Sequence, residues 1–393
     1  MGAGLTDQVV DPAQPIEQAE LRVHVKVREI VRSEVRHGGS MVARGPMREH
    51  PNVHPAPGCP SRRDGRPRGR APPSCANPHL STPGGSQGGP MRSIELGLVL
   101  PSEEAWTDGS TSRWAEIREL ALRAEAMGFD TVWIPDELLW RQADGTIHGW
   151  WECVALTGAV AAATSRVKVG TWILSALHRN PAITAKAVET LDEISGGRFV
   201  FGLGSGHAGR QAHAFGLPED HVIGRFEEAL EIIVPLLRAG RADFQGTYHA
   251  SRDLPQRPVG PRPGGIPIMI GAGGPRMLSL AARYADIWSW YVNERSDLAE
   301  FAPRQAALEA ACLEIGRDPA TIGRSAGIFV EPTDITGAAE AMAAPLQGSA
   351  EKIADGLRAF GEGGFTQVEI LLWPRTLGAL EAMAPVLDLL DAD

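Results

Sequence analysis

The strongest constraint on the fold is a regular alternation of short apolar runs and amphipathic stretches that begins after Met91. Short apolar runs are typical of buried strands, and a 3.6-residue apolar period is typical of helices. The sequence predicts eight strands, over residues 94–100, 131–135, 167–174, 199–204, 266–271, 286–292, 326–330 and 367–373. It predicts a helix after each strand, over residues 112–127, 150–164, 181–195, 224–239, 275–284, 297–316, 349–362 and 376–391. Eight such units in about 300 residues fit a (β/α)8 TIM barrel better than an open doubly wound sheet.

One segment of this region, residues 240–265, is too long for an ordinary connection between a helix and a strand. It follows the fourth strand–helix unit and is rich in proline, glycine and arginine. We predict that it forms an insertion over the mouth of the barrel.

The first 90 residues differ in composition from the rest of the chain. Residues 46–90 hold 11 of the 30 prolines, so they offer little apolar material for a core and are expected to be disordered. We favour a translated leader that lies upstream of a true start at Met91; a basic interaction arm is the alternative. Residues 91–393 are expected to form the folded domain.

Charge and composition restrict the partners of this chain. Residues 1–90 carry a net charge of +4 and the remaining residues a net charge of −14, which argues against nucleic acid or an anionic membrane as the main partner. No apolar run approaches the length of a membrane span, and no secretory signal pattern is present, so we expect a cytoplasmic protein. The four cysteines form no CxxC pair, and the histidines show no ligand spacing, so no metal site is predicted.

The stretch from Gly202 to His207, Gly-Leu-Gly-Ser-Gly-His, follows the fourth predicted strand. It lies where barrels place their active sites, at the carboxyl ends of the strands. Glycines at such a point let backbone N–H groups approach a ligand closely. A glycine pattern of this kind is weak evidence alone, because it has many uses.

Two further strand ends carry polar chemistry. Asp136 and Glu137 close the second strand and are candidates for proton transfer, although alternation along a strand turns at most one of them toward the barrel axis. Gly273 and Gly274 precede Pro275 after the fifth strand, and they leave N–H groups exposed at a helix N-terminus, a natural anion site.

Tryptophans gather at or near predicted strand ends and in the adjoining loops. Indoles in these places would wall a pocket for an apolar or aromatic substrate, and core packing is the alternative, above all for Trp133 and Trp288. The full set is Trp133, Trp140, Trp150, Trp151, Trp172, Trp288, Trp290 and Trp373.

Several motifs, taken jointly and in order, resemble the luciferase-like family of flavin- and deazaflavin-dependent oxidoreductases, over about residues 93–391. The resemblance rests on Ala126-Met-Gly-Phe-Asp-Thr-Val-Trp-Ile-Pro-Asp136, Val169-Gly-Thr-Trp-Ile173, Arg179-Asn-Pro-Ala182 with Thr190-Leu-Asp-Glu-Ile-Ser-Gly-Gly-Arg-Phe199, Gly202-Leu-Gly-Ser-Gly206, Ala214-Phe-Gly216 and Ile268-Met-Ile-Gly-Ala-Gly-Gly274. It implies a (β/α)8 barrel with insertions and a flavin-type cofactor.

The resemblance also implies roles for individual residues. It implies a non-proline cis peptide between Trp172 and Ile173, which would form a bulge behind the cofactor ring. Gly273 and Gly274 match a backbone phosphate clamp. The other implied cofactor contacts are Asp136, Ser175, Ser205, Gly206 and Arg210.

One departure from the family pattern is informative. In the sugar-phosphate dehydrogenases that this chain resembles, a histidine stands at the position of Glu137 and a glutamate at the position of His207. We predict that the exchanged pair, together with Asp136, handles protons at the ring. The alternative is that Glu137 and His207 only line the pocket. The lysines that hold sugar phosphate have no evident match, so that substrate is not expected.

The sequence thus favours an oxidoreductase that transfers hydride between coenzyme F420 and a small apolar or aromatic substrate. A monooxygenase that uses reduced FMN is the first alternative, and it would need a flavin reductase as a partner. A flavin-binding protein without turnover is the second. A homo-oligomer is compatible with the sequence.

Overall fold

The computed structural model describes residues 92–105, 109–142, 145–207, 209–332 and 343–392. The predicted leader at residues 1–90 lies outside these residues, as do Cys59 and Cys75. The other two cysteines, Cys153 and Cys312, are free and buried.

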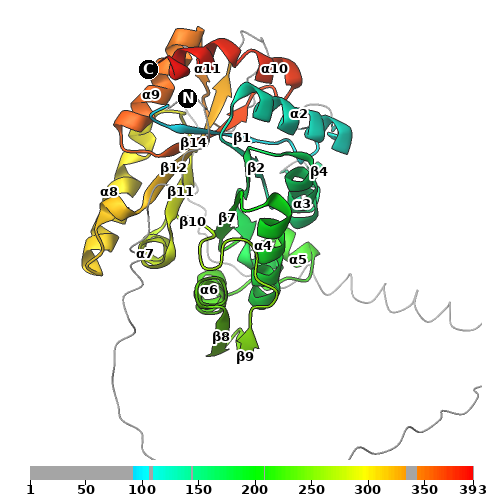
Figure 1. Ribbon diagram of the computed structural model, residues 1–393, viewed down its shortest axis with the longest axis vertical. Coiled ribbons are helices and arrows are strands. Elements are labelled where there is room, and N and C mark those ends of the chain that lie inside the picture. Colours follow the sequence, from blue (N-terminus) through cyan, green and yellow to red (C-terminus); the bar gives the residue numbers. More distant parts are fainter. Residues whose placement is uncertain (1–91, 106–108, 143–144, 208, 333–342, 393) are drawn as a thin grey trace, which may run out of the picture. The chain divides into compact units, whose positions relative to one another are not determined.

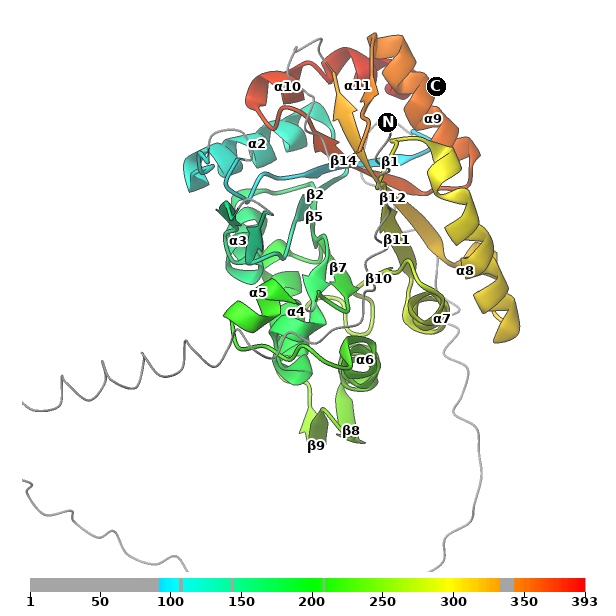
Figure 2. The same ribbon diagram turned by 180° about the vertical axis from the view of Figure 1, so that it is seen from behind.

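Eight parallel strands form a closed barrel (Figures 1 and 2). They are β1 (Glu95–Val99), β2 (Thr131–Ile134), β5 (Lys168–Thr171), β7 (Phe199–Gly204), β10 (Ile268–Gly271), β11 (Ile287–Tyr291), β12 (Gly323–Glu331) and β14 (Gln367–Leu372). The ring closes where β7 pairs with β10 and β14 pairs with β1. Seven of the eight predicted apolar runs contain one of these strands, and the run at 326–330 lies within β12, so the prediction of a (β/α)8 barrel is confirmed.

Helices lie on the outside of this ring (Figure 1). They are α2 (Trp114–Met127), α3 (Cys153–Ala163), α4 (Pro181–Ser195), α5 (Arg210–Ala214), α6 (Val222–Ala239), α7 (Pro275–Tyr284), α8 (Ala302–Glu314), α9 (Ala350–Glu362), α10 (Leu377–Glu381) and α11 (Ala384–Asp391). Local sequence sets their ends, as in α4. The Asn180 side chain accepts hydrogen bonds from two backbone N–H groups at its start, and Gly196 adopts the left-handed conformation at its end.

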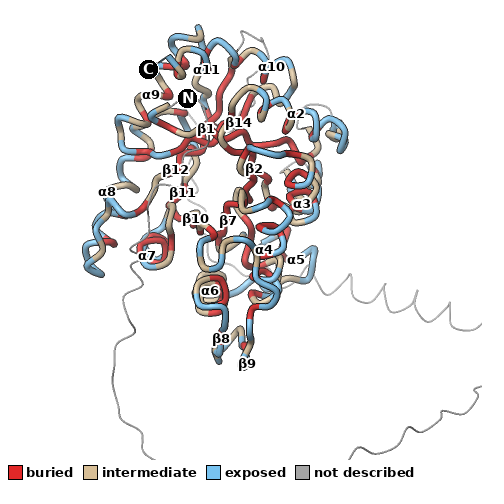
Figure 3. Tube along the Cα trace, in the orientation of Figure 1, coloured by how far each residue is buried: buried red, intermediate tan, exposed pale blue. Residues whose placement is uncertain are grey.

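Bulky side chains fill the barrel interior opposite glycines on neighbouring strands. Buried residues follow the strands throughout the ring (Figure 3). Trp133 on β2 is fully buried, and a Cβ atom at Gly97 on β1 or at Gly170 on β5 would overlap its indole. These two glycines are therefore needed for packing, because interiors leave no room for an added methyl group.

The segment at residues 240–265 contains a hairpin of β8 (Arg241–Gln245) and β9 (Ala250–Pro255). The hairpin starts where α6 ends and runs back along that helix. At its tip, three backbone N–H groups, those of residues 247–249, donate to the Glu228 carboxylate. The predicted insertion is present, but it flanks the mouth instead of covering it: only its tip, at His249, reaches a small cavity that Ser205 also lines.

Candidate active site

The polar residues singled out in the sequence gather at one end of the barrel, where the parallel strands finish. Asp136 and Glu137 follow β2, Trp172 follows β5, and Ser205 follows β7. A short hairpin of β3 (Leu139–Arg141) and β4 (Ile147–Gly149) and the 3-10 turn η3 (Ala176–His178) border the same end. The site therefore occupies the usual position for a barrel of this type.

The Trp172–Ile173 peptide bond at this end is cis, as the resemblance implied. The Ile173 side chain lies against three glycines of the adjoining strands. A Cβ atom added at Gly202 or Gly204 would lie only 2.9 or 2.7 Å from the terminal carbons of Ile173, and one added at Gly271 would overlap them. Gly202 and Gly204 were expected to let backbone N–H groups reach a ligand; in the structure Gly204 makes room for Ile173, and Gly202 makes room for both Ile173 and the Thr171 carbonyl oxygen.

Aromatic rings form a wall beside Ile173. The Trp172 ring meets Tyr291 edge-on, with centroids 6.2 Å apart, and Tyr291 stacks on Trp290 at 5.4 Å. Both indole nitrogens, and the Ser175 hydroxyl, are buried without a hydrogen-bond partner among the described residues. Trp133 and Trp288 pack in the core, so the alternative interpretation holds for those two.

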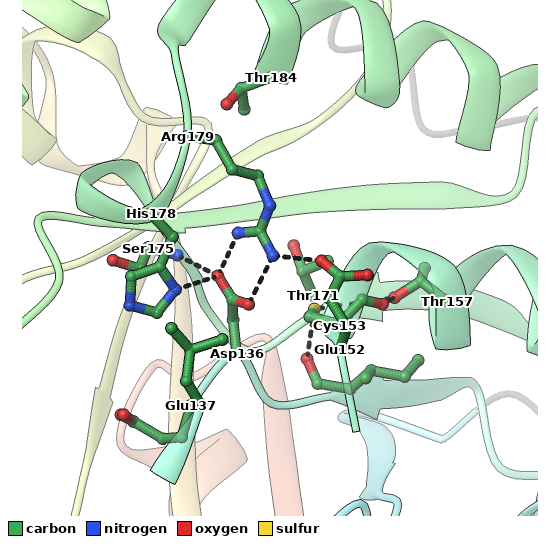
Figure 4. A network of polar contacts seen from close by, with 12 residues as sticks. Asp136, Glu137, Glu152, Cys153, Thr157, Thr171, Ser175, His178, Arg179 and Thr184 are labelled. Carbon is green, nitrogen blue, oxygen red and sulfur yellow. Dashed lines mark hydrogen bonds and ion pairs between the residues drawn. The ribbon is translucent and has the colours of Figure 1, made fainter. Parts of the chain in front are cut away.

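Asp136 lies behind the mouth in a cluster of donors, and its side chain has no exposed surface (Figure 4). Its carboxylate accepts two hydrogen bonds from Arg179, at 2.6 and 2.9 Å, and one from the Ser175 backbone N–H at 2.8 Å. His178 Nδ1 lies 3.3 Å from the same carboxylate. Arg179 also binds Glu152, which closes the cluster toward solvent.

These contacts fix the ionisation of the cluster. Burial alone would raise the pKa of Asp136, but hydrogen bonds from His178 and Arg179 outweigh it and lower the pKa. Burial would likewise lower the pKa of Arg179, whereas the two carboxylates raise it. The lowered pKa favours the charged form of Asp136, whose two oxygens face these donors. The contacts describe a residue that positions Arg179 and the Ser175 backbone; the catalytic and cofactor-contacting roles expected of Asp136 stay predictions.

Glu137 and His207 meet at the mouth. His207 Nδ1 lies 3.2 Å from Glu137 Oε1, and the two side chains are 67% and 30% exposed. The hydrogen bond that His207 donates to Glu137 raises the pKa of His207, against an opposing effect of desolvation. The structure thus brings the predicted exchanged pair together, with Asp136 turned away from Glu137 just beyond the end of β2 (Figure 4).

Gln211 is a member of this site that no sequence pattern singles out. It belongs to α5, is 8% exposed, and its Nε2 donates to Glu137 Oε2 at 2.9 Å. His178 was also missed, because the spacing of the histidines in the sequence marks none of them as a ligand or a catalytic group. No local pattern marks Gln211 or His178. Arg179, the other donor to Asp136, belongs to a family motif, and that motif was the only feature of the sequence that pointed to the donors around Asp136.

The remaining predicted cofactor contacts surround the same mouth. Gly274 is the N-cap of α7, and a Cβ there would meet nothing within 4 Å, so its backbone faces open space. Gly273 has no such freedom, because a Cβ would overlap the Trp290 ring. Ser205 and Gly206 follow β7, and a Cβ on Gly206 would overlap Ser175. Arg210 opens α5, and its side chain lies outside what the structure describes.

A groove of about 600 Å³ adjoins the N-termini of α6 and α7. His221, Tyr248, Arg276 and Glu227 line it, with Arg276 paired to Glu227. Within the described ranges there is no group of three His, Cys, Asp or Glu side chains that could hold a metal ion. None of the described helices is both long enough and apolar enough to cross a membrane.

Comparison with known proteins agrees with this architecture. Residues 94–376 match the family model described as luciferase-like monooxygenase. The F420-dependent glucose-6-phosphate dehydrogenase of Amycolatopsis mediterranei (strain U-32) is 36% identical over 178 residues, which are 44% of this chain and 51% of that protein. The F420-dependent hydroxymycolic acid dehydrogenase of Mycobacterium tuberculosis is 32% identical over 252 residues, 63% of this chain and 65% of that protein. The chain thus spans between half and two thirds of these relatives.

Solved structures share the fold at lower sequence identity. The coenzyme F420-dependent tetrahydromethanopterin reductase from Methanopyrus kandleri aligns with a TM-score of 0.59 at 21% identity, over 75% of this chain and 97% of that one. A long-chain alkane monooxygenase aligns with a TM-score of 0.61 at 14% identity, over 77% and 92% of the two chains. At these identities the likeness shows the barrel alone.

Proposed function

The chain belongs to the luciferase-like monooxygenase family, and we propose that it is an oxidoreductase that transfers hydride between coenzyme F420 and a small apolar or aromatic substrate. The observation that carries the proposal is the Glu137–His207 pair, held 3.2 Å apart at the barrel mouth. Hydride transfer to or from a carbonyl or alcohol carbon requires a proton to move at the neighbouring oxygen, and a histidine with a raised pKa suits that task.

The residues at the mouth fit a flavin-type cofactor. Buried polar atoms normally have partners, so the unpartnered Ser175 hydroxyl and the indole nitrogens of Trp172 and Trp290 suit the polar edge of a ring. The uncapped N-terminus of α7 at Gly274 suits a phosphate. Ile173, Ser205, Gly206 and Gly273 would complete the binding surface. When bound, the deazaflavin supplies the ring carbon that accepts or gives the hydride.

The chain's own residues would handle the proton. With Nδ1–H of His207 directed at Glu137, the Nε2 atom is left to hold or release a proton at the substrate oxygen. Glu137 stabilises the imidazolium and keeps the ring oriented. Asp136 orders Arg179 and the Ser175 backbone beneath them and takes no proton.

Two observations support the choice of cofactor and substrate class. Two relatives that share about a third of their aligned residues with this chain are described as F420-dependent. The edge-on pair of Trp172 and Tyr291 offers apolar and aromatic contacts, which suit an apolar or aromatic substrate better than a sugar phosphate; Trp290 supports this pair from behind, between Tyr291 and Arg304.

Parallel titrations of the purified protein with F420 and FMN, followed by fluorescence quenching, test the cofactor. We expect F420 to bind at least about tenfold more tightly than FMN, a difference of about 1.4 kcal/mol. Tighter binding of FMN would favour the reduced-FMN monooxygenase, which needs a reductase partner. Tight binding of either, without a substrate-linked change in the cofactor's absorbance, would favour a non-catalytic binding protein.

A further inference from the structure

The buried amide of Gln211 has a fixed orientation. Its Oε1 accepts hydrogen bonds from the backbone N–H groups of Leu138, at 2.8 Å, and Leu139, at 3.0 Å. A backbone N–H can only donate, so the oxygen must lie on that side and the nitrogen on the other. The loop that follows Glu137 is thereby tied to α5.

The nitrogen of the same amide faces two acid–base side chains. Gln211 Nε2 lies 2.9 Å from Glu137 Oε2 and 3.5 Å from His178 Nε2. Because an amide nitrogen can only donate, His178 Nε2 must present its lone pair. The His178 proton is then on Nδ1, which lies 3.3 Å from Asp136 Oδ2. The Gln211 amide on one side and the Asp136 carboxylate on the other thus favour the same tautomer of His178.

We infer that Gln211 is a positioning residue, which turns Glu137 Oε1 toward His207 and separates this pair from the buried His178–Asp136 pair. Glu137 Oε2 is occupied by the amide, so Oε1 is left for His207. An amide neither takes up nor releases a proton near neutral pH, so protons do not pass from Glu137 to His178. The part that concerns turnover rests on the proposed function; the placement itself does not.

Histidine side-chain NMR on the full chain without cofactor tests the placement. We expect His178 to be the Nδ1–H tautomer near neutral pH, with its signals assigned by loss in His178→Gln. In Gln211→Leu we expect His178 to keep that tautomer, because Asp136 Oδ2 still faces Nδ1. We also expect the pKa of His207 to fall toward its ordinary value, because Glu137 is no longer held against it.

A second variant keeps the test decisive if Gln211→Leu does not fold. Gln211→Glu retains both backbone hydrogen bonds at Leu138 and Leu139 but places a carboxyl group against Glu137 Oε2. The two carboxyl groups then share a proton, which weakens the charge beside His207, and its pKa again falls. Gln256→Leu is the matched control, because Gln256 is a buried glutamine whose amide donates to the Ala185 carbonyl at 2.8 Å, away from these histidines.

Kinetics separate positioning from a structural role. In Gln211→Leu we expect kcat to fall about tenfold, with KM and F420 affinity within about threefold of the unmodified protein. A wild-type His178 protonated on Nε2, or a His207 titration unchanged in both Gln211 variants, would overturn the inference. Absence of F420 turnover in the wild type, with the NMR outcomes as expected, would refute the proposed function and leave the placement of Gln211 intact.

Discussion

Replacing Glu137 and His207 singly and together is the sharpest test of the site. We expect Glu137→Gln and His207→Gln each to lower turnover about 100-fold, which corresponds to about 2.7 kcal/mol of barrier. The two residues act on one proton, so the double variant should lose little more than either single variant. Independent contributions would instead multiply to about 10⁴-fold.

The exposure of the Glu137–His207 pair indicates that it contributes little to the free energy of unfolding. The His207 side chain is 67% exposed, so solvent screens its contact with Glu137. Exposed pairs of this kind contribute about 1 kcal/mol or less to folding. A 100-fold loss of turnover with an unfolding free energy changed by less than about 1 kcal/mol would therefore locate the effect in proton handling rather than in folding.

The assay is steady-state hydride transfer, followed by F420 absorbance, with urea unfolding in parallel. His213→Gln is the matched control, because His213 and Glu219 form a similar exposed pair at 2.8 Å on the surface. Full activity in either single variant of the main pair, or a His213→Gln variant that loses as much activity, would refute the assignment.

The structure also predicts the direction in which the pH profile of activity shifts in these variants. Glu137 raises the pKa of His207, so the imidazolium persists to higher pH than in an isolated histidine. If the imidazolium is the proton donor, activity falls as pH rises through that raised pKa. In Glu137→Gln the alkaline fall in kcat/KM should move to lower pH. An unmoved profile would exclude His207 as the titrating donor.

Three further outcomes follow from particular contacts. Gly274→Val should fold, because nothing lies within 4 Å of its Cβ, yet weaken cofactor binding by about 1–3 kcal/mol in the quenching titration; Gly378→Val, equally unhindered, should not weaken it. Burial raises the pKa of Glu369 to about 7, above its value of about 4.5 in the unfolded chain. Between these two pH values the folded state binds this proton and the unfolded chain does not, so the protein loses stability as the pH rises from about 4.5 to about 7. Glu369→Gln should thus stabilise the protein by about 1–3 kcal/mol at pH 8 and little at pH 4.5 in thermal unfolding. Gly271→Ala should cost about 1–3 kcal/mol in urea unfolding through overlap with Ile173, and adding Ile173→Val should restore most of it; no rescue would contradict this packing.

Most of the fold could be predicted from the sequence, because strands and helices are set by local apolar periods. The apolar run at residues 199–204 becomes β7 with those bounds, and the run at 326–330 becomes the core of β12. The insertion at residues 240–265 was placed less well, since composition marks a long connection but not the surface on which it packs.

The site was predictable only in part. Its position at the strand ends follows from topology, and Asp136 and Glu137 point apart as expected, although both lie beyond the end of β2. The partners of these residues depend on contacts across 33 to 74 positions, such as those of Gln211 with Glu137 and His178. Nothing local shows that a glutamine in a short helix turns inward, or that the glycines at 202 and 204 face an isoleucine.

The fit of Ile173 against three glycines limits how this barrel can change through single substitutions. An added methyl group at Gly204 or Gly271 meets Ile173, one at Gly202 meets both Ile173 and the Thr171 carbonyl oxygen, and a larger residue at position 173 would meet the ends of β7 and β10 at once. Remodelling this floor requires coordinated changes on separate strands, which are improbable one mutation at a time. The exposed Trp140 on the β3–β4 hairpin has no such constraint. Variants selected for new substrates should therefore accumulate at the rim, while the floor keeps its shape.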